Sequence, residues 1–276
     1  MVKQLSVSIV LYQSSSEVEL AVASVLNTSL DIILYLIDNS PTDRLKYLAS
    51  SDRVVYVFNN ANLGYGAAHN IAMQKSIAQN VKYHLVMNPD ISFEQGTLER
   101  IYEFMEQHEA VGSLMPKVFD VEGSLQKLCK LLPSPLNLMG RRFFSRIGWA
   151  KRLNDQYELS EFDYNSILNV PALSGCFMFI RTSILAKSGL FDPRYFMYLE
   201  DYDLGRRIHK CSKTVFYPEV AVTHIHAQES YKNKTLLKIH IRSAISYFNK
   251  WGWIVDSERK RFNNAVLLEL KQKKEK

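Results

Sequence analysis

Three acidic residues follow an apolar and aromatic run in the stretch YFMYLEDYDLGRRIH, residues 195–209. Glu200 and Asp201 stand at the expected start of a helix, where the helix dipole favours a negative charge. An ionised carboxylate at the edge of a cleft can accept a proton from a hydroxyl nucleophile, so this pair could supply a general base. Stabilisation of the helix start alone is the other interpretation. Asp203 and Arg207 lie four residues apart and are predicted to form an ion pair on the same helix.

A second group of residues could hold a divalent metal ion on a phosphate. The motif NPD, residues 88–90, follows an apolar run of strand length. A single carboxylate such as Asp90 can bind Mg²⁺ or Mn²⁺ while phosphate oxygens and waters complete the shell. Strand alternation in the motif HIH places His224 and His226 on one face, where one of them could be a second ligand. An ordinary turn at 88–90 and two structural histidines are the alternatives.

A glycine-rich segment, NLGYGAAHN at residues 62–70, precedes an expected helix. Small residues at every second position allow backbone to approach a ligand closely, and a helix N-terminus favours negative charge. The spacing differs from the dinucleotide-binding pattern G-x-G-x-x-G, and helix packing would also explain the small residues. Gly175 in SGCFMFIR marks another close backbone approach.

Strands and helices alternate along the first 110 residues and would bring these groups together. Apolar runs predict strands at 5–12, 32–40, 53–60 and 83–90, and periodicity predicts helices at 16–26, 64–80 and 97–109. Continuous apolar strands between helices are typical of a parallel sheet covered on both faces. The carboxyl ends of such strands meet at one edge, where ligands bind. The polar residues expected at that edge are Asp38, Asn59 to Asn62, and Asn88 to Asp90.

The second half of the chain is less regular. Residues 131–144 read as irregular or short-helical, and 173–191 as a strand followed by a short helix. Residues 213–226 predict a strand. Two helices, roughly 233–250 and 256–273, are expected to close the chain.

Composition excludes several classes of protein. The chain has 276 residues, 47% hydrophobic and 22% charged, which suits a large folded domain rather than a disordered one. Its apolar runs fall short of the roughly 18–20 residues of a membrane span, and its first residues do not read as a signal peptide. Cys129, Cys176 and Cys211 are far apart and fit no metal-binding spacing, which indicates a reducing cytosol.

The net charge of +6 is concentrated in residues 127–152 and in the C-terminal third, together with aromatic residues. An anionic membrane surface, a nucleic acid and a solvated basic face are the alternatives. Nucleic acid is disfavoured because the sequence contains no recognition motif for it. The residues expected to face a membrane are Arg141, Arg142, Phe143, Phe144, Trp149, Trp251 and Trp253.

Seven motifs occur in the order seen in family 2 glycosyltransferases, and residues 5–250 resemble these inverting enzymes of GT-A fold. The chain looks most like the bacterial rhamnosyltransferase branch, which builds O-antigen, lipopolysaccharide and related surface polysaccharides. The motifs are VSIVLYQSSS, LIDNSPTD, NLGYGAAHN, LVMNPD, SGCFMFIR, FDPRYFMYLEDYDLGRRI and VTHIH.

This resemblance implies an α/β fold of GT-A type, Rossmann-like, with a mostly parallel sheet, helices on both faces and additional C-terminal helices. Residues 1–230 would form the catalytic domain. Within it, 1–110 would bind the nucleotide-sugar and 111–230 the acceptor. Residues 231–276 would be a helical tail packed on the same domain.

The resemblance also implies roles at the nucleotide-sugar. Asp38 would contact the nucleotide base, with Asn39 and Ser40 shaping that turn. The donor would be bordered by Asn62, Gly64 and Asn70.

Further roles concern the metal and the reaction. NPD stands where many GT-A enzymes carry D-x-D, so Asp90 would hold Mg²⁺ or Mn²⁺ on the diphosphate, with Asn88 in place of the first acid. His224 would complete the metal site, with His226 as the alternate. Asp201 would be the general base that deprotonates the acceptor hydroxyl, and Glu200 would orient it or the acceptor.

The resulting hypothesis is a cytoplasmic glycosyltransferase, peripheral at the inner face of the cell membrane. Its expected donor is dTDP-L-rhamnose, and its acceptor a polyprenyl-diphosphate-linked or growing surface glycan. A UDP-sugar donor and a non-catalytic nucleotide-sugar-binding subunit remain open. A sugar nucleotidyltransferase ranks lower because the loop after the first strand, YQSSSE, is neither glycine-rich nor basic. Residues 129–165 are expected to be a lid or an acceptor-binding element.

Overall fold

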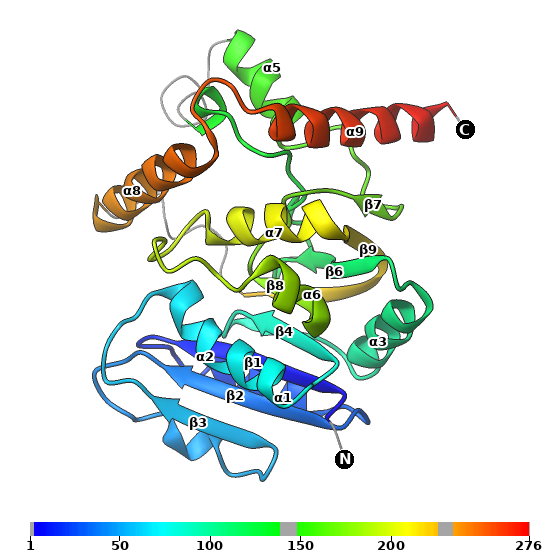
Figure 1. Cartoon of the computed structure of the whole chain (residues 1–276). Helices are drawn as coiled ribbons and strands as arrows, with labels where there is room; N and C mark the ends of the chain where they lie inside the picture. Colours follow the sequence, from blue (N-terminus) through cyan, green and yellow to red (C-terminus); the bar gives the residue numbers. More distant parts are fainter. Residues whose placement is uncertain (1–2, 139–147, 226–233, 276) are drawn as a thin grey trace.

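The computed structural model describes residues 3–138, 148–225 and 234–275 (Figure 1). A mixed sheet with the strand order β3-β2-β1-β4-β8-β6-β9-β5 forms its centre, and β7 pairs with β9. The α/β class with a central sheet therefore agrees with the prediction from the sequence.

Four parallel strands form the first half of the sheet. Leu11 at the end of β1 is in register with Asp38 at the end of β2, and Asp38 is in register with Phe58 on β3. The strands are β1 (Leu5–Leu11), β2 (Ile32–Asp38), β3 (Val54–Phe58) and β4 (Tyr83–Met87). Their carboxyl ends consequently meet at one edge, as their apolar character predicts.

The second half of the sheet is mixed in direction. β8 is antiparallel to β4 and β6, whereas β9 is parallel to β6. β6 was not predicted from the sequence, and its register with β9 shifts between Pro116 and Lys117. The strands are β5 (Ile91–Ser92), β6 (Val111–Phe119), β7 (Leu168–Asn169), β8 (Phe177–Arg181) and β9 (Lys213–His224).

Helices cover both faces of the sheet, as expected. α1 (Val18–Leu26) and α3 (Thr97–Gln107) share an apolar core with the odd-numbered residues of β1. On the other face lie α2 (Tyr65–Ala78), α6 (Thr182–Ser188) and α7 (Glu200–Cys211). A 3-10 turn, η1 (Lys46–Leu48), precedes β3.

Three further helices lie beyond the sheet, at the upper end of Figure 1: α5 (Gly148–Tyr157), α8 (Lys234–Trp251) and α9 (Ser257–Lys274). α8 packs on the segment that leads into α7, because Tyr247 and Phe248 are buried against Tyr195 and Leu199. α9 packs Phe262 against Leu132 and Ala172, so the tail contacts the same body that carries the sheet.

None of the helices in these described ranges combines the length and the apolarity needed to cross a bilayer. The three cysteines are free thiols.

Candidate active site

The turn after β2 is built around a fully buried carboxylate. Oδ1 of Asp38 accepts a hydrogen bond from the backbone N–H of Ser40 at 2.8 Å, and Oδ2 accepts one from the Tyr56 hydroxyl. Burial, followed by the bond to Asp38, raises the pKa of Tyr56. Asp38 thus fixes the shape of the turn that carries Asn39 and Ser40, and its predicted contact with a base stays a prediction.

Asn39 ties this turn to the glycine-rich segment. Its amide nitrogen lies 3.3 Å from the backbone oxygen of Gly64 and 3.5 Å from Oδ1 of Asn62. Oδ1 of Asn62 also accepts the backbone N–H of Gly64 at 3.0 Å. Three of the predicted residues therefore form one connected group at the carboxyl edge of the sheet.

Gly64 has a φ of +83°, and a Cβ added there would lie 2.3 Å from the backbone oxygen of Phe196. Only glycine fits this position, because the backbone of the segment before α7 passes directly over it. Asn70, by contrast, uses its whole amide on the backbone N–H and C=O of Phe191. Asn70 thus fixes the backbone at Phe191 near the site. Its predicted position next to the donor stays a prediction.

The motif NPD meets His224 because β5 pairs with the end of β9, with Ile91 opposite His224. Oδ2 of Asp90 lies 3.4 Å from Nε2 of His224, and Nδ2 of Asn88 lies 3.4 Å from the same nitrogen. Nδ1 of His224 lies 3.2 Å from Oε1 of Gln126. This contact fixes the orientation of the imidazole ring on the side away from Asp90. His226, the alternate ligand, lies outside the described residues.

A buried oxygen in this group has no partner. Oδ1 of Asp90 is buried and makes no hydrogen bond. The same holds for Nε2 of Gln126. Across the described ranges, no group of three or more His, Cys, Asp or Glu side chains could hold a metal by itself. Among the described His, Cys, Asp and Glu side chains, Asp90 and His224 are therefore the two possible ligands here, and a bound molecule or water would supply others.

Asp201 stands in the first turn of α7 and is held by backbone donors. Its Oδ2 accepts the N–H of Gly175 at 3.0 Å, and its Oδ1 accepts its neighbour's N–H, that of Tyr202, at 2.9 Å. A Cβ at Gly175 would lie 3.2 Å from the Cβ of Asp201, so the close backbone approach expected at this glycine is present.

Glu200 precedes it and is buried, with Oε2 lacking any hydrogen-bond partner. Burial, and then the neighbouring Asp201, raises the pKa of Glu200 well above its usual range. Burial also raises the pKa of Asp201, but the two backbone donors and the Lys130 cation act against that rise. A proton shared by the pair is therefore favoured on Glu200, and the negative charge on Asp201.

This pair makes stability depend on pH. A carboxyl whose folded pKa is raised binds its proton more tightly in the native state, so stability falls as pH rises above the carboxyl's usual range. We expect Glu200→Gln to be more stable than the wild type at pH 8, by about 1 kcal/mol, because the wild-type carboxyl, ionised in the unfolded chain, has to take up a proton on folding and the neutral amide does not. At pH 4 the difference should shrink.

Urea unfolding at pH 4, 6 and 8 would measure this difference. Glu94→Gln, which removes an exposed carboxyl, is the matched control and should follow the wild type at every pH. A Glu200→Gln curve parallel to that of the wild type would contradict the assignment of the proton.

Tyr65 connects the two halves of the site and was not identified from the sequence. Its hydroxyl lies 3.0 Å from Oδ1 of Asn88 and 2.7 Å from the backbone oxygen of Gly175. Burial, followed by the charges of Glu200, Cys176, Asp201 and Asp90, raises the pKa of Tyr65. The tyrosine thus stays neutral and holds the NPD turn beside the Asp201 loop. Its position directly after Gly64 was the available signal.

The segment entering α7 adopts an unusual backbone. Tyr198 and Leu199 have φ values of +71° and +64°, a left-handed conformation that costs energy in residues other than glycine. Ser243 on α8 donates a hydrogen bond to the backbone oxygen of Met197 at 2.8 Å. α8 therefore braces the strained turn that aims Glu200 and Asp201.

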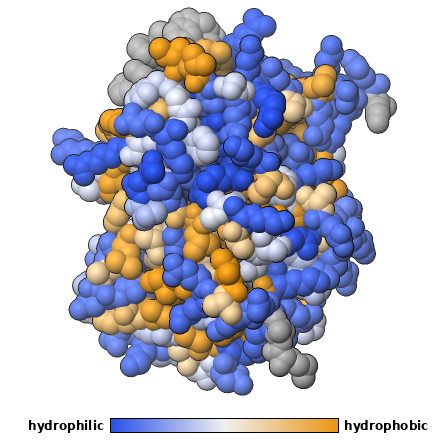
Figure 2. Space-filling model, in the orientation of Figure 1, coloured by the Kyte–Doolittle hydropathy of each residue, from blue (hydrophilic) through white to orange (hydrophobic). Residues whose placement is uncertain are grey.

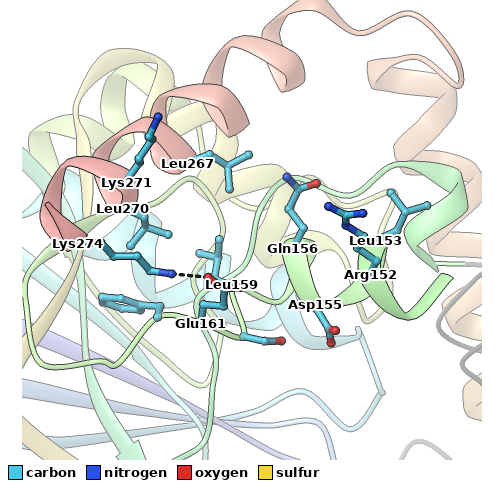
Figure 3. A pocket seen from close by; sticks show the side chains of 12 residues that line it. Arg152, Leu153, Asp155, Gln156, Leu159, Glu161, Leu267, Leu270, Lys271 and Lys274 are labelled. Atoms are coloured by element: carbon cyan, nitrogen blue, oxygen red, sulfur yellow. Dashed lines mark hydrogen bonds and ion pairs between the residues drawn. The ribbon is translucent and has the colours of Figure 1, made fainter. Parts of the chain in front are cut away.

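A groove of about 760 Å³ lies between α5 and α9 (Figure 3). Its lining includes Leu159, Leu267 and Leu270, and an ion pair between Lys274 and Glu161 spans it. None of its lining residues is a predicted site residue, so the site described above is the stronger candidate for chemistry. The groove does include part of the 129–165 segment, whose predicted role as a lid or an acceptor-binding element stays a prediction.

Comparison with known proteins gives a consistent result. The model of the family described as glycosyl transferase family 2 matches residues 6–188. The chain is 30% identical over 238 residues to the N-acetylglucosaminyl-diphospho-decaprenol L-rhamnosyltransferase of Mycobacterium tuberculosis, a match that covers 80% of this chain and 75% of that protein. It is 23% identical over 212 residues to the low-salt glycan biosynthesis hexosyltransferase Agl10 of Haloferax volcanii, covering 76% of this chain and 63% of that one.

Among solved structures, the fold resembles the crystal structure of GalNAc-T7 with UDP, GalNAc and Mn²⁺, with a TM-score of 0.62 and 17% sequence identity. The match covers 91% of this chain and spans about half (50%) of the other. At this identity the likeness supports the fold alone.

Proposed function

The chain belongs to glycosyl transferase family 2 and is a glycosyltransferase, and from this premise we propose that it transfers L-rhamnose from dTDP-L-rhamnose to a sugar on a polyprenyl diphosphate. The observation that carries the proposal is the similarity over 80% of the chain to a rhamnosyltransferase whose name specifies such an acceptor. The residues that resemble the family's motifs also lie together at one edge of the sheet.

In the proposed reaction Asp201 accepts the proton of the acceptor hydroxyl. The hydroxyl oxygen forms a bond to the anomeric carbon of the donor sugar, and the bond from that carbon to the diphosphate breaks with inversion. The Gly175 and Tyr202 N–H groups support the charge on Asp201 before it takes the proton. Glu200, whose raised pKa favours the protonated carboxyl, would be a hydrogen-bond donor that orients the base or the acceptor.

The residues at the NPD turn fit a divalent metal ion. Asp90 has a buried oxygen without a partner, its other oxygen lies 3.4 Å from Nε2 of His224, and both are ligand types that Mg²⁺ or Mn²⁺ accepts. When bound there, the ion would neutralise charge on the leaving diphosphate. Asn88 replaces an acid at this turn, so the protein supplies one carboxylate, and Gln126 keeps the histidine ring oriented.

A thermal-shift panel with dTDP, UDP and GDP, each with Mg²⁺, Mn²⁺ or EDTA, tests the donor and the metal. A ligand at 100 times its dissociation constant adds about 2.7 kcal/mol to the unfolding free energy, or roughly 5–10 °C for a chain of this size. We expect that shift with dTDP and a divalent ion, and less with EDTA. Asp90→Ala should lose the metal-dependent part, whereas Glu94→Gln should keep it.

Transfer is then assayed with dTDP-L-rhamnose and N-acetylglucosaminyl-diphospho-polyprenol, with mass spectrometry of the lipid product. A shift with UDP alone would replace the proposed donor by a UDP-sugar. Nucleotide binding without transfer to any lipid-linked sugar would favour a nucleotide-sugar-binding subunit, and the proposed reaction would fail.

We also propose that the protein works at the inner face of the cell membrane, because its proposed acceptor is lipid-linked. Of the residues expected to face a membrane, Arg141 to Phe144 and the side chain of Trp149 lie outside what the structure describes. Trp251 points inward instead, since its Nε1 donates a hydrogen bond to Oδ1 of Asp203 at 2.8 Å. Trp253 remains exposed.

A further inference from the structure

The turn between α8 and α9 presents two aliphatic side chains almost entirely to solvent. Ile254 is 90% exposed and Val255 is 85% exposed, the highest values among the large hydrophobic residues of the described ranges. Single exposed aliphatic residues are common, but two in succession beside a 44% exposed Trp253 form an apolar tip. We call residues 253–255 the tip.

Both ends of the tip are firmly held. Nε1 of Trp253 donates a hydrogen bond to Asn249 at 2.8 Å, and its ring packs 5.2 Å from that of Phe248. On the other side, Asp256 caps α9 by accepting the N–H of Arg259 at 2.9 Å. Because the flanking residues are fixed, Ile254 and Val255 project from a defined turn.

The tip continues into the outer face of α8. That face carries cations and isoleucines at helical spacing: Lys234, Lys238, Ile241, Arg242 and Ile245 are all exposed. α8 contains no Asp or Glu, and three of its four Lys and Arg residues are exposed; the fourth, Lys250, pairs with Asp192 and Asp203 on the inner side. Lys260 and Arg261 at the start of α9 add exposed positive charge beside the tip.

Apolar surface reaches the upper end of the molecule in Figure 2, the end at which Figure 1 shows α8 passing into α9. Basic residues alternating with exposed aliphatic ones match the chemistry of an anionic bilayer, where aliphatic groups enter the acyl boundary and cations stay with the phosphates. A protein partner would not require this exclusion of acids from a whole helix.

We propose that the tip and the outer face of α8 form the surface by which this protein docks on a bilayer containing anionic phospholipids. The inference rests on the proposed function only in that a lipid-linked acceptor gives such docking a purpose. The opposite face of α8 braces the strained turn before Glu200, so a docked bilayer would lie about one helix diameter, roughly 10–12 Å, from that turn. Acceptor carried in the bilayer would then meet the side of the molecule that holds Asp201.

Vesicle co-sedimentation of the whole chain tests this surface. We expect the protein to bind phosphatidylglycerol-containing vesicles, to bind neutral phosphatidylcholine vesicles much less, and to be released by high salt. The double variant Ile254→Ser/Val255→Ser should bind at least about tenfold more weakly, because the inserted apolar area is lost. Leu20→Ser, which removes a 56% exposed leucine on α1 at the lower end of Figure 1, should bind like the wild type.

Three outcomes would overturn the docking surface: no vesicle binding by the wild type, unchanged binding by the double variant, or a dimer in light scattering that the double variant converts to monomer. The last would identify the tip as a contact between two copies. The thermal shift with dTDP is measured on the same variants and should not change. If the wild type binds no nucleotide, the proposed function fails. The vesicle result tests the docking surface independently of that outcome.

Discussion

Asp201→Asn is expected to lower kcat for sugar transfer by about 10²–10⁴-fold, the usual contribution of a positioned general base. Asparagine has the same shape, and its single oxygen can still accept the N–H of Gly175; only the bond from the adjacent Tyr202 N–H is lost, so the turn and the start of α7 should keep their fold. It cannot take the proton of the acceptor hydroxyl. The loss should therefore appear in kcat, while the dissociation constant for dTDP stays within about threefold of the wild type.

Initial rates at saturating donor, with dTDP binding measured by calorimetry, separate these two quantities. Asp155→Asn, which changes an exposed acid on α5 outside the site, should retain the wild-type rate. Full turnover by Asp201→Asn would refute its role as the base. A parallel loss of dTDP binding would instead indicate that Asp201 holds the donor site together.

The polar residues at the strand ends could be predicted from the sequence because the rule is local and topological. Continuous apolar strands between helices predict a parallel sheet, and the strand ends then have to share an edge. Asp38 and the NPD turn were found in this way, and the structure places them at the ends of β2 and β4. The ion pair between Asp203 and Arg207 follows from helical spacing and is present at 2.8 Å.

What the sequence did not reveal depends on contacts between distant segments. The strand β6 lacks a clear signal, because Gly112 and Pro116 interrupt its apolar pattern. The pairing of β5 with the end of β9, which brings Asp90 to His224, joins segments more than a hundred residues apart. Trp251 was expected to face lipid because its type and neighbours suit a membrane, but a buried carboxylate on another helix accepts its N–H. Composition does not show which side of a helix is covered.

Arg206 links α7 to the start of α9 through a buried ion pair. Its guanidinium is 1% exposed and forms two hydrogen bonds to Asp256, at 2.6 and 2.7 Å, and one to Glu258 at 3.0 Å. The guanidinium carbon also lies 4.1 Å from the centre of the Trp251 ring. The Asp256 side chain is only 3% exposed, so removal of the cation would leave a buried carboxylate without its ion-pair partner, supported only by the backbone N–H and the charge of Arg259.

Arg206→Met is therefore expected to reduce the free energy of unfolding by about 3–5 kcal/mol, as when one partner of a buried ion pair is removed. The melting temperature should fall by roughly 10 °C. Adding Asp256→Asn should recover part of the loss, because asparagine can still cap α9 while the unpaired charge disappears.

Lys274→Met, which breaks the exposed ion pair with Glu161, is the matched control and should leave the melting temperature unchanged. Calorimetric melting of the wild type, Arg206→Met, the double variant and Lys274→Met measures these differences. If Arg206→Met is no less stable than Lys274→Met, α9 is held by apolar packing alone. The predicted recovery in the double variant identifies the buried charge, rather than lost packing on Trp251, as the cause.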